Sequence, residues 1–514
     1  MGEQKHADQV VSNQEILAGK DDAGLGITGD IQNIPEDEKI LEKQLLRKID
    51  LLIMPLIVVI YLMNFIDRNN YAAARLQGLQ DDLNLTSERY QAGLGIFFVG
   101  YILGSVPSNQ ILNYTGRPSL YLGLTTCAWG LVSALTALVQ SYGGILGCRL
   151  ALGFVEAPFF PGVLFYLSKW YTKTELSMRM SIFYIGSLIA GALGSLIAAG
   201  ILHGLAGKNG MPGWRWLYII EGVITIFLGL VVIVMLPEFP HTWKRLPPEL
   251  RRVANRRMAI EAAEADVDEG EGMSQVKGFV LAMKDIRVHV LAFAFMCKSA
   301  AGGFSFFFPT LTKTLGYSNT VSLLLCAPPY AFVALWSIAH SWASDRLRKR
   351  FWFLIYPMPV VIIGWIIFMT TDSFGPRYLS LFLMLMIFSI NGTFFAWIAT
   401  SIPRPPAKRA AAYAYINAVG GSASIWTPFT YRDEDKPHYR PALGLNIALW
   451  VVTAACFVFM YFSLTRENKR LDRLEDEDVS LSHADFERLK KTAEMEGVDI
   501  ATARKLQKNH RFVI

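Results

Sequence analysis

Twelve apolar segments, each close to the ~20 residues that a transmembrane helix needs, occupy most of the sequence between residues 51 and 464. Inside a bilayer only helices and closed barrels satisfy their own backbone hydrogen-bonding groups. The segments therefore predict an all-α membrane protein with twelve transmembrane helices. We place them at about 51–71, 90–112, 119–139, 143–166, 180–202, 215–236, 288–311, 321–343, 351–371, 377–400, 411–430 and 442–464.

The composition agrees with a membrane setting. Hydrophobic residues make up 52% of the 514 residues and charged residues only 18%, whereas a typical soluble domain carries about 25% charged residues. The net charge of +6 comes from short Lys and Arg clusters between apolar segments, which fits membrane topology better than nucleic-acid binding. The five cysteines lie in apolar segments without a partner at ligand spacing, so we expect no disulfide framework, metal site or cofactor.

A strongly charged stretch separates the sixth apolar segment from the seventh and divides the segments into two sets of six. The tails and this stretch are basic, as are the loops after segments four, eight and ten, so the positive-inside rule assigns them to the cytosol. The predicted organisation is a cytosolic tail at 1–50, a six-helix bundle at 51–236, a cytosolic linker at 237–287, a second six-helix bundle at 288–464 and a cytosolic tail at 465–514.

Local signals add three expectations. A charged, leucine-spaced stretch ending at Asp50 predicts a short amphipathic helix at the membrane surface. Pro328-Pro329 in the eighth segment and Gly420-Gly421 in the eleventh predict interrupted helices, which membranes tolerate where they line a cavity. Asn84, in the tripeptide Asn84-Leu85-Thr86, is a candidate glycan acceptor in the first outer loop.

Arg149 and Glu156 place two charges inside the fourth apolar segment. Each costs roughly 2.5 to 3.5 kcal/mol near a bilayer centre on insertion scales, so such residues usually serve an ion or substrate pathway. Seven residues correspond to about 700° of helical rotation, so both side chains face the same way. The alternative is a buried ion pair that locks two helices together. Asp67 and Arg68 lie late in the first segment, at a depth comparable with Arg149, and Glu156 should lie deeper.

Two loops carry an internal repeat, at 109–117 after segment two and at 341–350 after segment eight. Both resemble the cytosolic loop motif of the major facilitator superfamily, Gly-x-x-x-Asp-Arg-x-Gly-Arg-basic. The first copy has Asn at the first Gly and the Asp positions and Tyr at the first Arg, and the second has Ser at the first Gly and Arg at the second. The resemblance makes these residues candidates for cytosolic gating loops: Asn113, Gly116, Arg117, Asp345 and Arg346.

Several further stretches resemble one branch of that superfamily, the anion:cation symporters. Residues 48–70 are similar to its first helix, 149–162 to its fourth, 213–222 to the entry into its sixth, and 438–441 with 466–470 to the flanks of its twelfth. Residues 168–171 and the ending 512–514 look closest to fungal nicotinate-permease-like and allantoate-permease-like proteins. The resemblance covers residues 45–510.

The resemblance implies uptake of a small organic anion, such as nicotinate or another vitamin-like carboxylate, together with protons, by alternating access between two six-helix bundles. It implies a monomer in the lipid bilayer, most naturally the plasma membrane. A guanidinium matches a carboxylate, and a buried carboxylate can accept and release a proton. We therefore expect Arg149 and Arg68 to contact the substrate anion, and Glu156 and Asp67 to carry protons.

Three other polar residues in apolar segments leave alternatives open. Lys298 is a second candidate anion contact, or else a snorkelling or paired lysine. Asn417 precedes the Gly420-Gly421 pair, where related transporters place a polar substrate contact, although helix packing would also explain it. Glu221 is expected to pair with Arg215 or with a loop rather than to carry protons.

Functions from other classes also fit parts of the sequence. A proton-antiport exporter of a fungal metabolite would use the same fold and proton chemistry. A non-transporting membrane sensor fits less well because the predicted cytosolic tails are short. The sequence contains no nucleophile motif, phosphate loop or His-Glu metal cluster, so we do not expect an enzyme.

Overall fold

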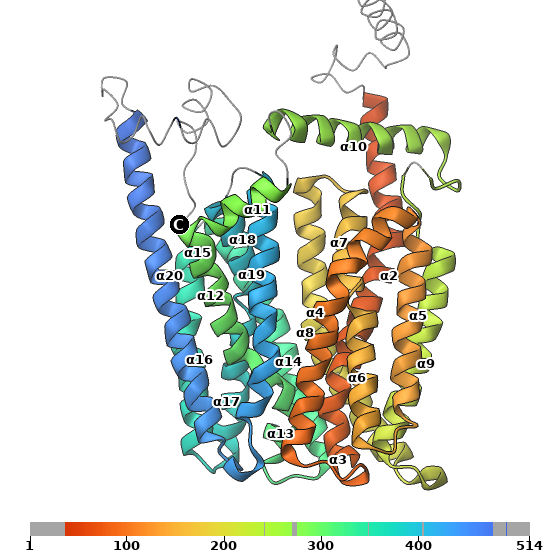
Figure 1. The fold of residues 1–514 in the computed structure, drawn as a ribbon, viewed down its shortest axis with the longest axis vertical. Coiled ribbons are helices and arrows are strands. Elements are labelled where there is room, and N and C mark those ends of the chain that lie inside the picture. Colours follow the sequence, from red (N-terminus) through yellow and green to blue (C-terminus); the bar gives the residue numbers. More distant parts are fainter. Residues whose placement is uncertain are drawn as a thin grey trace, which may run out of the picture.

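The computed structural model describes residues 36–240, 242–269, 275–347, 349–402, 406–475 and 490, and these residues form helices and short connections (Figure 1). The elements are α2 (Glu36–Leu76), α3 (Leu79–Asp82), α4 (Ser87–Thr115), α5 (Pro118–Thr136), α6 (Tyr142–Glu156), α7 (Phe159–Ser168), α8 (Lys173–Leu205), η1 (Lys208–Gly210), α9 (Gly213–Met235), α10 (Pro248–Glu269), α11 (Gln275–Met283), α12 (Ile286–Ala301), η2 (Gly302–Phe307), α13 (Phe308–Lys313), α14 (Asn319–Leu347), α15 (Arg350–Ile355), α16 (Pro357–Thr370), α17 (Phe374–Leu385), η3 (Met386–Phe388), α18 (Asn391–Ser401), α19 (Pro406–Trp426), η4 (Thr427–Thr430), η5 (Asp433–Asp435) and α20 (Arg440–Glu475).

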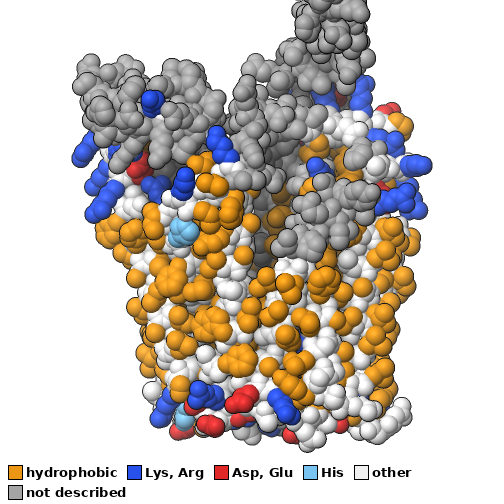
Figure 2. Space-filling view, viewed as in Figure 1, with side chains coloured by type: hydrophobic (Ala, Val, Ile, Leu, Met, Phe, Trp, Pro, Cys, Tyr) orange, Lys and Arg blue, Asp and Glu red, His pale blue; other side chains and the backbone are white. Residues whose placement is uncertain are grey.

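Ten helical stretches among the described residues are long and apolar enough to cross a membrane. They match ten of the twelve predicted segments, and the other two predicted segments coincide with α4 and α19. Figure 2 shows a broad belt of hydrophobic side chains, with Lys and Arg gathered toward the two ends of the molecule. The prediction of an all-α membrane protein is confirmed, and the count of twelve crossings stays a prediction.

The two ends of the molecule carry different elements (Figure 1). We call the end with α10 and the start of α2 the linker face, and the end with α3 and η5 the loop face. Helix α10 lies across the linker face, where Arg257 contacts Glu42 of α2 at 2.8 Å and Glu175 of α8 at 2.5 Å. These ion pairs attach the linker to the first helices of the chain.

The start of α2 differs from the sequence prediction. The charged stretch before the first apolar segment forms no separate surface helix, because one helix runs without interruption from Glu36 to Leu76. Arg179 of α8 binds Asp50 at 2.7 Å and so anchors α2 at the point where its charged part meets its apolar part. Of the predicted cytosolic tail at 465–514, the structure describes residues up to Glu475 and Lys490.

Glycines allow helices α4 and α6 to approach each other closely. A Cβ atom on Gly153 of α6 would overlap the carbonyl oxygen of Phe97 on α4, and one on Gly100 of α4 would overlap the carbonyl oxygen of Leu150. Membrane helices lack a strong hydrophobic drive to associate, so small residues at such crossings permit the close packing that replaces it. This contact holds Arg149 and Glu156 against α4 and α2.

The expected helix interruptions occur elsewhere in the chain. Helix α14 continues through Pro328 and Pro329, and α19 continues through Gly420 and Gly421, so those two predictions are wrong. Gly420 serves packing instead, since a Cβ atom there would overlap the ring of Phe295. An interruption of the hydrogen-bond pattern separates α6 from α7 at Ala157 and Pro158, although both residues keep helical backbone angles.

The first and second halves of the chain meet through α8 with α14, α4 with α19 and α2 with α13. Three polar contacts join the halves at the loop face. Arg75 binds Asp433 at 2.7 Å, Gln91 donates to the carbonyl of Tyr431 at 2.5 Å, and Asn319 donates to the carbonyl of Leu76 at 2.7 Å. These contacts close the loop face in this conformation.

Candidate functional site

A polar stripe on α2 forms the centre of the candidate site. Asn64, Asp67 and Asn70 are spaced three residues apart, which puts them on one side of a helix with about 4.5 Å of rise between neighbours. All three are buried. Each contacts a different partner, so the stripe connects α2 with several other helices.

Asp67 occupies the middle of the stripe and is fully buried. Its two carboxylate oxygens accept hydrogen bonds from Ser133 of α5 at 3.2 Å and from Thr225 of α9 at 3.0 Å. No cation pairs with it among the described residues. A buried carboxylate with neutral donors alone is poorly stabilised as an anion, and this setting favours binding of a proton.

Glu156 is paired with Arg68. The Nη2 atom of Arg68 lies 3.1 Å from Oε2 of Glu156 and 3.5 Å from Oδ1 of Asn64. The guanidinium group also lies 5.1 Å from the ring centre of Phe97 and 5.0 Å from that of Tyr101. Glu156 is completely buried, whereas 15% of the Arg68 side chain is exposed. The arginine is therefore the accessible member of the pair.

Arg149 does not pair with Glu156, and the buried ion pair that joins two helices here is the one between Glu156 of α6 and Arg68 of α2. Its Nε donates to the carbonyl of Gly93 on α4 at 3.1 Å, and its guanidinium lies between the rings of Tyr71 and Phe97, at 4.7 and 4.8 Å. Only 2% of the residue is exposed, and Nη1 has no hydrogen-bond partner. Arg149 lies about two turns closer to the loop face than Glu156, and Arg68 lies at the depth of the carboxylate.

Lys298 introduces a buried cation into the second half of the chain. It lies on α12, is 6% exposed, and donates to the side chain of Asn391 on α18. Its ammonium group lies 5.6 Å from the ring centres of Phe295 and Phe388. A snorkelling lysine would reach water at the membrane surface, and this one does not.

The remaining predicted site residues lie apart from this cluster. Asn417 is exposed and donates to the carbonyl of Tyr413 in its own helix at 3.0 Å. Asn84 is exposed in a turn at the loop face with φ 48. The candidate gating-loop residues lie at the linker face. Gly116 has a φ of 60, and Arg117 is exposed directly before α5. Asp345 lies 3.8 Å from Arg350, Arg346 lies over the ring of Trp342, and the side chain of Asn113 is outside the described residues.

Glu221 was not expected in this cluster. The predicted pairing with Arg215 is wrong, because Arg215 binds Asp82 at 2.9 Å and the carbonyl of Ala137 at 2.7 Å. Glu221 follows Arg215 by six residues on α9 and so lies about 9 Å further from the loop face. There it is fully buried and accepts a hydrogen bond from Asn70. The three-residue spacing of Asn64, Asp67 and Asn70 is the sequence signal that could have pointed to it.

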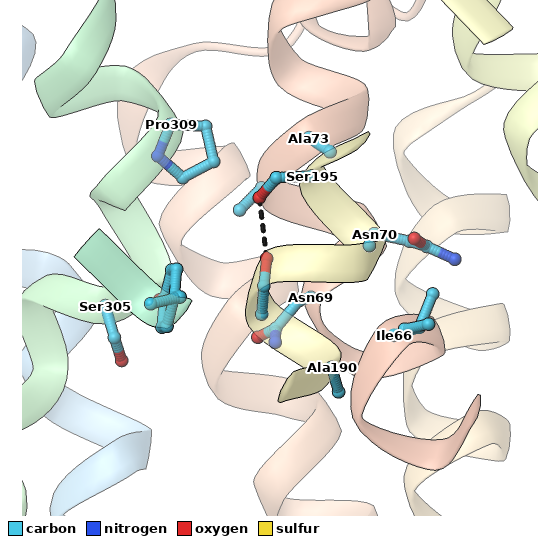
Figure 3. Close-up of a pocket in the computed structure, with 12 residues that line it drawn as sticks. Ile66, Asn69, Asn70, Ala73, Ala190, Ser195, Ser305 and Pro309 are labelled. Atoms are coloured by element: carbon cyan, nitrogen blue, oxygen red, sulfur yellow. Dashed lines mark hydrogen bonds between the residues drawn. The ribbon is translucent and has the colours of Figure 1, made fainter. Parts of the chain in front are cut away.

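A pocket lies between the two halves, beside the part of α2 from Ile66 to Ala73 (Figure 3). Its polar lining comes from Asn69 and Asn70 of α2, Ser195 of α8, Ser305 of η2 and Tyr330 of α14, and it includes no Asp, Glu, Lys or Arg. Ser195 donates to the carbonyl of Gly191 at 2.8 Å, and the side chain of Asn70 points away from Ser305 and Pro309.

Comparison with known proteins gives a consistent family assignment. Residues 57–428 match the model of the Major Facilitator Superfamily. The MFS-type transporter cnsO of Penicillium expansum is 33% identical over 85% of this chain and 86% of its own. The Major facilitator-type transporter hxnP of Emericella nidulans is 27% identical over 84% of this chain and 88% of its own.

Solved structures share the fold at low identity. A D-xylose-proton symporter is 16% identical, with a TM-score of 0.61 over 80% of this chain and 96% of its own. A bacterial homologue of the human lysosomal transporter Spinster, in an inward-facing conformation, is 14% identical, with a TM-score of 0.61 over 81% of this chain and 97% of its own.

Proposed function

The chain belongs to the major facilitator superfamily, and from this premise we propose that it takes up a small organic anion, such as nicotinate or another carboxylate, by proton symport. It is a multi-pass membrane transporter and not an enzyme. The observation that carries the proposal is the pair of a partly exposed Arg68 and a fully buried Glu156. An arginine in that position can bind a carboxylate, and its partner can then bind a proton.

The pair offers a direct way to couple the anion to the proton. A substrate carboxylate that binds Arg68 competes with Glu156 for the guanidinium. Loss of one partner from a buried ion pair costs about 3–5 kcal/mol, because the remaining charge is left uncompensated. Glu156 avoids that cost by taking up a proton, so anion binding and protonation favour each other.

Asp67 provides a second proton site beside the first. Its hydroxyl partners Ser133 and Thr225 can hydrogen-bond both the anionic and the neutral carboxyl group. A monovalent anion that enters with one proton moves no net charge, so only the pH gradient drives it. A second proton on Asp67 would add the membrane potential, about 2.3 kcal/mol per 100 mV.

Three further residues complete the proposed anion site. Arg149 has a free guanidinium nitrogen and would reach the substrate once Tyr71 and Phe97 separate. Lys298, a buried cation on α12, would add a contact from the second half of the chain. Asn417, exposed on α19, would supply a neutral contact when the halves close around the substrate.

Alternating access requires two bundles that rock against each other, and we assign this role to residues 51–236 and 288–464. The linker face would then be cytosolic, with both termini and the gating loops, and the loop face would point outward with Asn84 available to a glycan. Closure of the loop face by Arg75 and Asp433 corresponds to a state that is sealed toward the outside. We place the transporter in the plasma membrane as a monomer.

Uptake of labelled carboxylates tests this function. Nicotinate, pantothenate, biotin, allantoate and sugar acids would be supplied to transporter-deficient cells at acidic and neutral external pH. We expect one class of acid to accumulate at acidic pH and to be lost after an uncoupler is added. Accumulation that ignores the uncoupler would contradict proton symport, and faster loss of a preloaded compound without uptake would indicate an exporter.

A further inference from the structure

Helices α2 and α9 run antiparallel and form two polar contacts, one turn apart. Asp67 of α2 accepts from Thr225 of α9, and Asn70 of α2 donates to Glu221 of α9. Because Asn70 follows Asp67 by three residues and Glu221 precedes Thr225 by four, the second contact lies about 5 Å nearer the loop face. Glu156 binds Arg68 at the depth of Asn64, on the other side of Asp67.

Glu221, Asp67 and Glu156 therefore follow one another along the polar stripe of α2, from the loop face inward. Each carboxyl group is fully buried. Only Glu156 has a cation partner within the described part of the chain. The stripe thus arranges three carboxyl groups in sequence, about one helical turn apart, ending at the pair of Glu156 and Arg68.

Glu221 lies in an environment that disfavours a permanent negative charge. One carboxyl oxygen accepts from the neutral amide of Asn70, and the other has no hydrogen-bond partner. The titratable groups that interact with it are Asp67 from α2 and Tyr218 from the preceding turn of α9. The cation Arg149 of α6 lies against Tyr71 and acts on Tyr218, and it forms no ion pair with Glu221. A buried carboxyl group without a paired cation favours the neutral acid in this conformation.

Asn70 connects Glu221 to the space between the two halves. The same asparagine lines the pocket of Figure 3 and donates to Glu221 on its other side. Asn70 therefore contacts both the carboxyl group and the pocket. A rotation of Asn70 would expose the free oxygen of Glu221 to water in the pocket, where the group could exchange its proton.

We propose that Glu221 is a third proton-carrying carboxyl group, which exchanges protons with the bundle interface through Asn70 and passes them to Asp67. In the transfer the proton leaves the hydroxyl oxygen of Glu221 and bonds to a carboxylate oxygen of Asp67. Glu221 becomes anionic as Asp67 becomes neutral, and the total charge is unchanged. This inference rests on one part of the proposed function, which is that protons drive transport.

The proposal can be tested by infrared difference spectroscopy on the purified full chain in liposomes. Spectra recorded at acidic and at alkaline pH are subtracted, and no substrate is added. We expect a buried carboxylic-acid band that titrates in the wild type, is absent from Glu221→Gln, and persists in the control Glu434→Gln, which alters an exposed loop residue. Proton release measured with an indicator dye should fall by one proton per chain in Glu221→Gln only. A band and proton count unchanged by Glu221→Gln would overturn the proposal.

A second variant keeps the test decisive if Glu221→Gln does not fold. Asn70→Ala removes the hydrogen bond and leaves the carboxyl group in place, so the titrating band should shift in frequency without losing intensity. An unshifted band would refute the role of Asn70. Because no substrate is used, failure of every acid in the uptake panel would leave this result standing and would reject the proposed function alone.

Discussion

At the level of single residues, Arg68 is the group through which we propose that anion binding is coupled to protonation. It holds Glu156 at 3.1 Å, lies against the rings of Phe97 and Tyr101, and keeps part of its side chain exposed. Arg149 is bound to a backbone carbonyl and enclosed by aromatic rings. The two arginines therefore differ in access, and the order in which a substrate meets them follows from this difference.

Glu156→Gln should uncouple transport from the proton gradient, because glutamine keeps the size of the side chain but cannot carry a proton. Each pH unit of gradient contributes about 1.4 kcal/mol, so the accumulation ratio of the identified acid should fall about tenfold per unit. Exchange of substrate across proteoliposomes without a gradient should persist. Glu434→Gln is the control, and a variant that still concentrates substrate would remove Glu156 from the proton path.

Lys298→Gln should weaken substrate binding from the second half of the chain. A hydrogen bond to a charged group contributes about 1.5–3 kcal/mol, which corresponds to a rise in KM of roughly 10- to 150-fold. The matched control is Lys313→Gln, because Lys313 is a lysine on α13 that donates to the carbonyl of Tyr317. An unchanged KM in Lys298→Gln would restrict this lysine to its contact with Asn391.

At the scale of helices, the site depends on how closely α4 and α6 approach. The glycines at their crossing bring the backbone of α4 against Arg149, and the hydrogen-bond pattern of the helix is interrupted at Ala157 and Pro158, next to Glu156. In this arrangement α6 presents both charged residues toward α2 and α4. The packing of α4 against α6 thus determines which side chains the carboxylate of Glu156 can reach.

Gly153→Ala should lower the thermal stability of the purified transporter, since its methyl group would overlap the carbonyl of Phe97. Overpacking of this kind typically costs about 1–3 kcal/mol. Gly147→Ala is the control on the same helix, because no atom lies within 4 Å of a Cβ there. It should leave stability unchanged or raise it by up to about 1 kcal/mol. Equal melting temperatures for the two variants would contradict the close crossing.

At the scale of the whole molecule, a few polar contacts at the loop face hold the two halves together. Arg75 and Asp433 come from opposite halves, and only 5% of the arginine side chain is exposed. Gln91 and Asn319 add hydrogen bonds to backbone carbonyls across the same boundary. Such a small number of contacts can be broken and reformed in each transport cycle.

Asp433→Asn should shift the population toward a conformation with the loop face open. A partly exposed ion pair contributes up to about 1 kcal/mol, which corresponds to roughly a fivefold change in population. Spin labels attached at Asp81 and Glu434, both exposed at the loop face, would report the change as a longer distance. An identical distance distribution in wild type and variant would show that the other contacts suffice for closure.

The same ion pair should not respond to pH in the range where uptake does. Burial disfavours the charged form of Asp433, but hydrogen bonds from Lys436 and the charge of Arg75 outweigh it and lower the pKa of this carboxyl group below its ordinary value of 3.8. Because the pKa of Asp433 is lowered, the ion pair stabilises the closed loop face fully at pH values above 3.8. This stabilisation is lost only when the pH falls through the lowered pKa. Between about pH 5 and 8, Asp433→Asn should therefore leave the shape of the pH profile of uptake unchanged, whereas Glu156→Gln should flatten it.

The sequence alone determined the membrane fold and most of the charged residues of the site. Apolar length and intramembrane charge are local properties that a chain displays before it folds, so the helical spans, Asp67, Arg68, Arg149 and Glu156 could be identified without coordinates. The superfamily could be recognised from short motifs for the same reason.

Which residues became partners follows from how the helices pack. Glu156 binds Arg68 rather than Arg149, and Glu221 meets Asn70 rather than Arg215, because helix crossings and depths bring these groups together. Gly420 of α19 packs against Phe295, and the helix continues through the glycine pair. Such choices depend on contacts between residues far apart in the chain, and neither spacing nor composition contains that information.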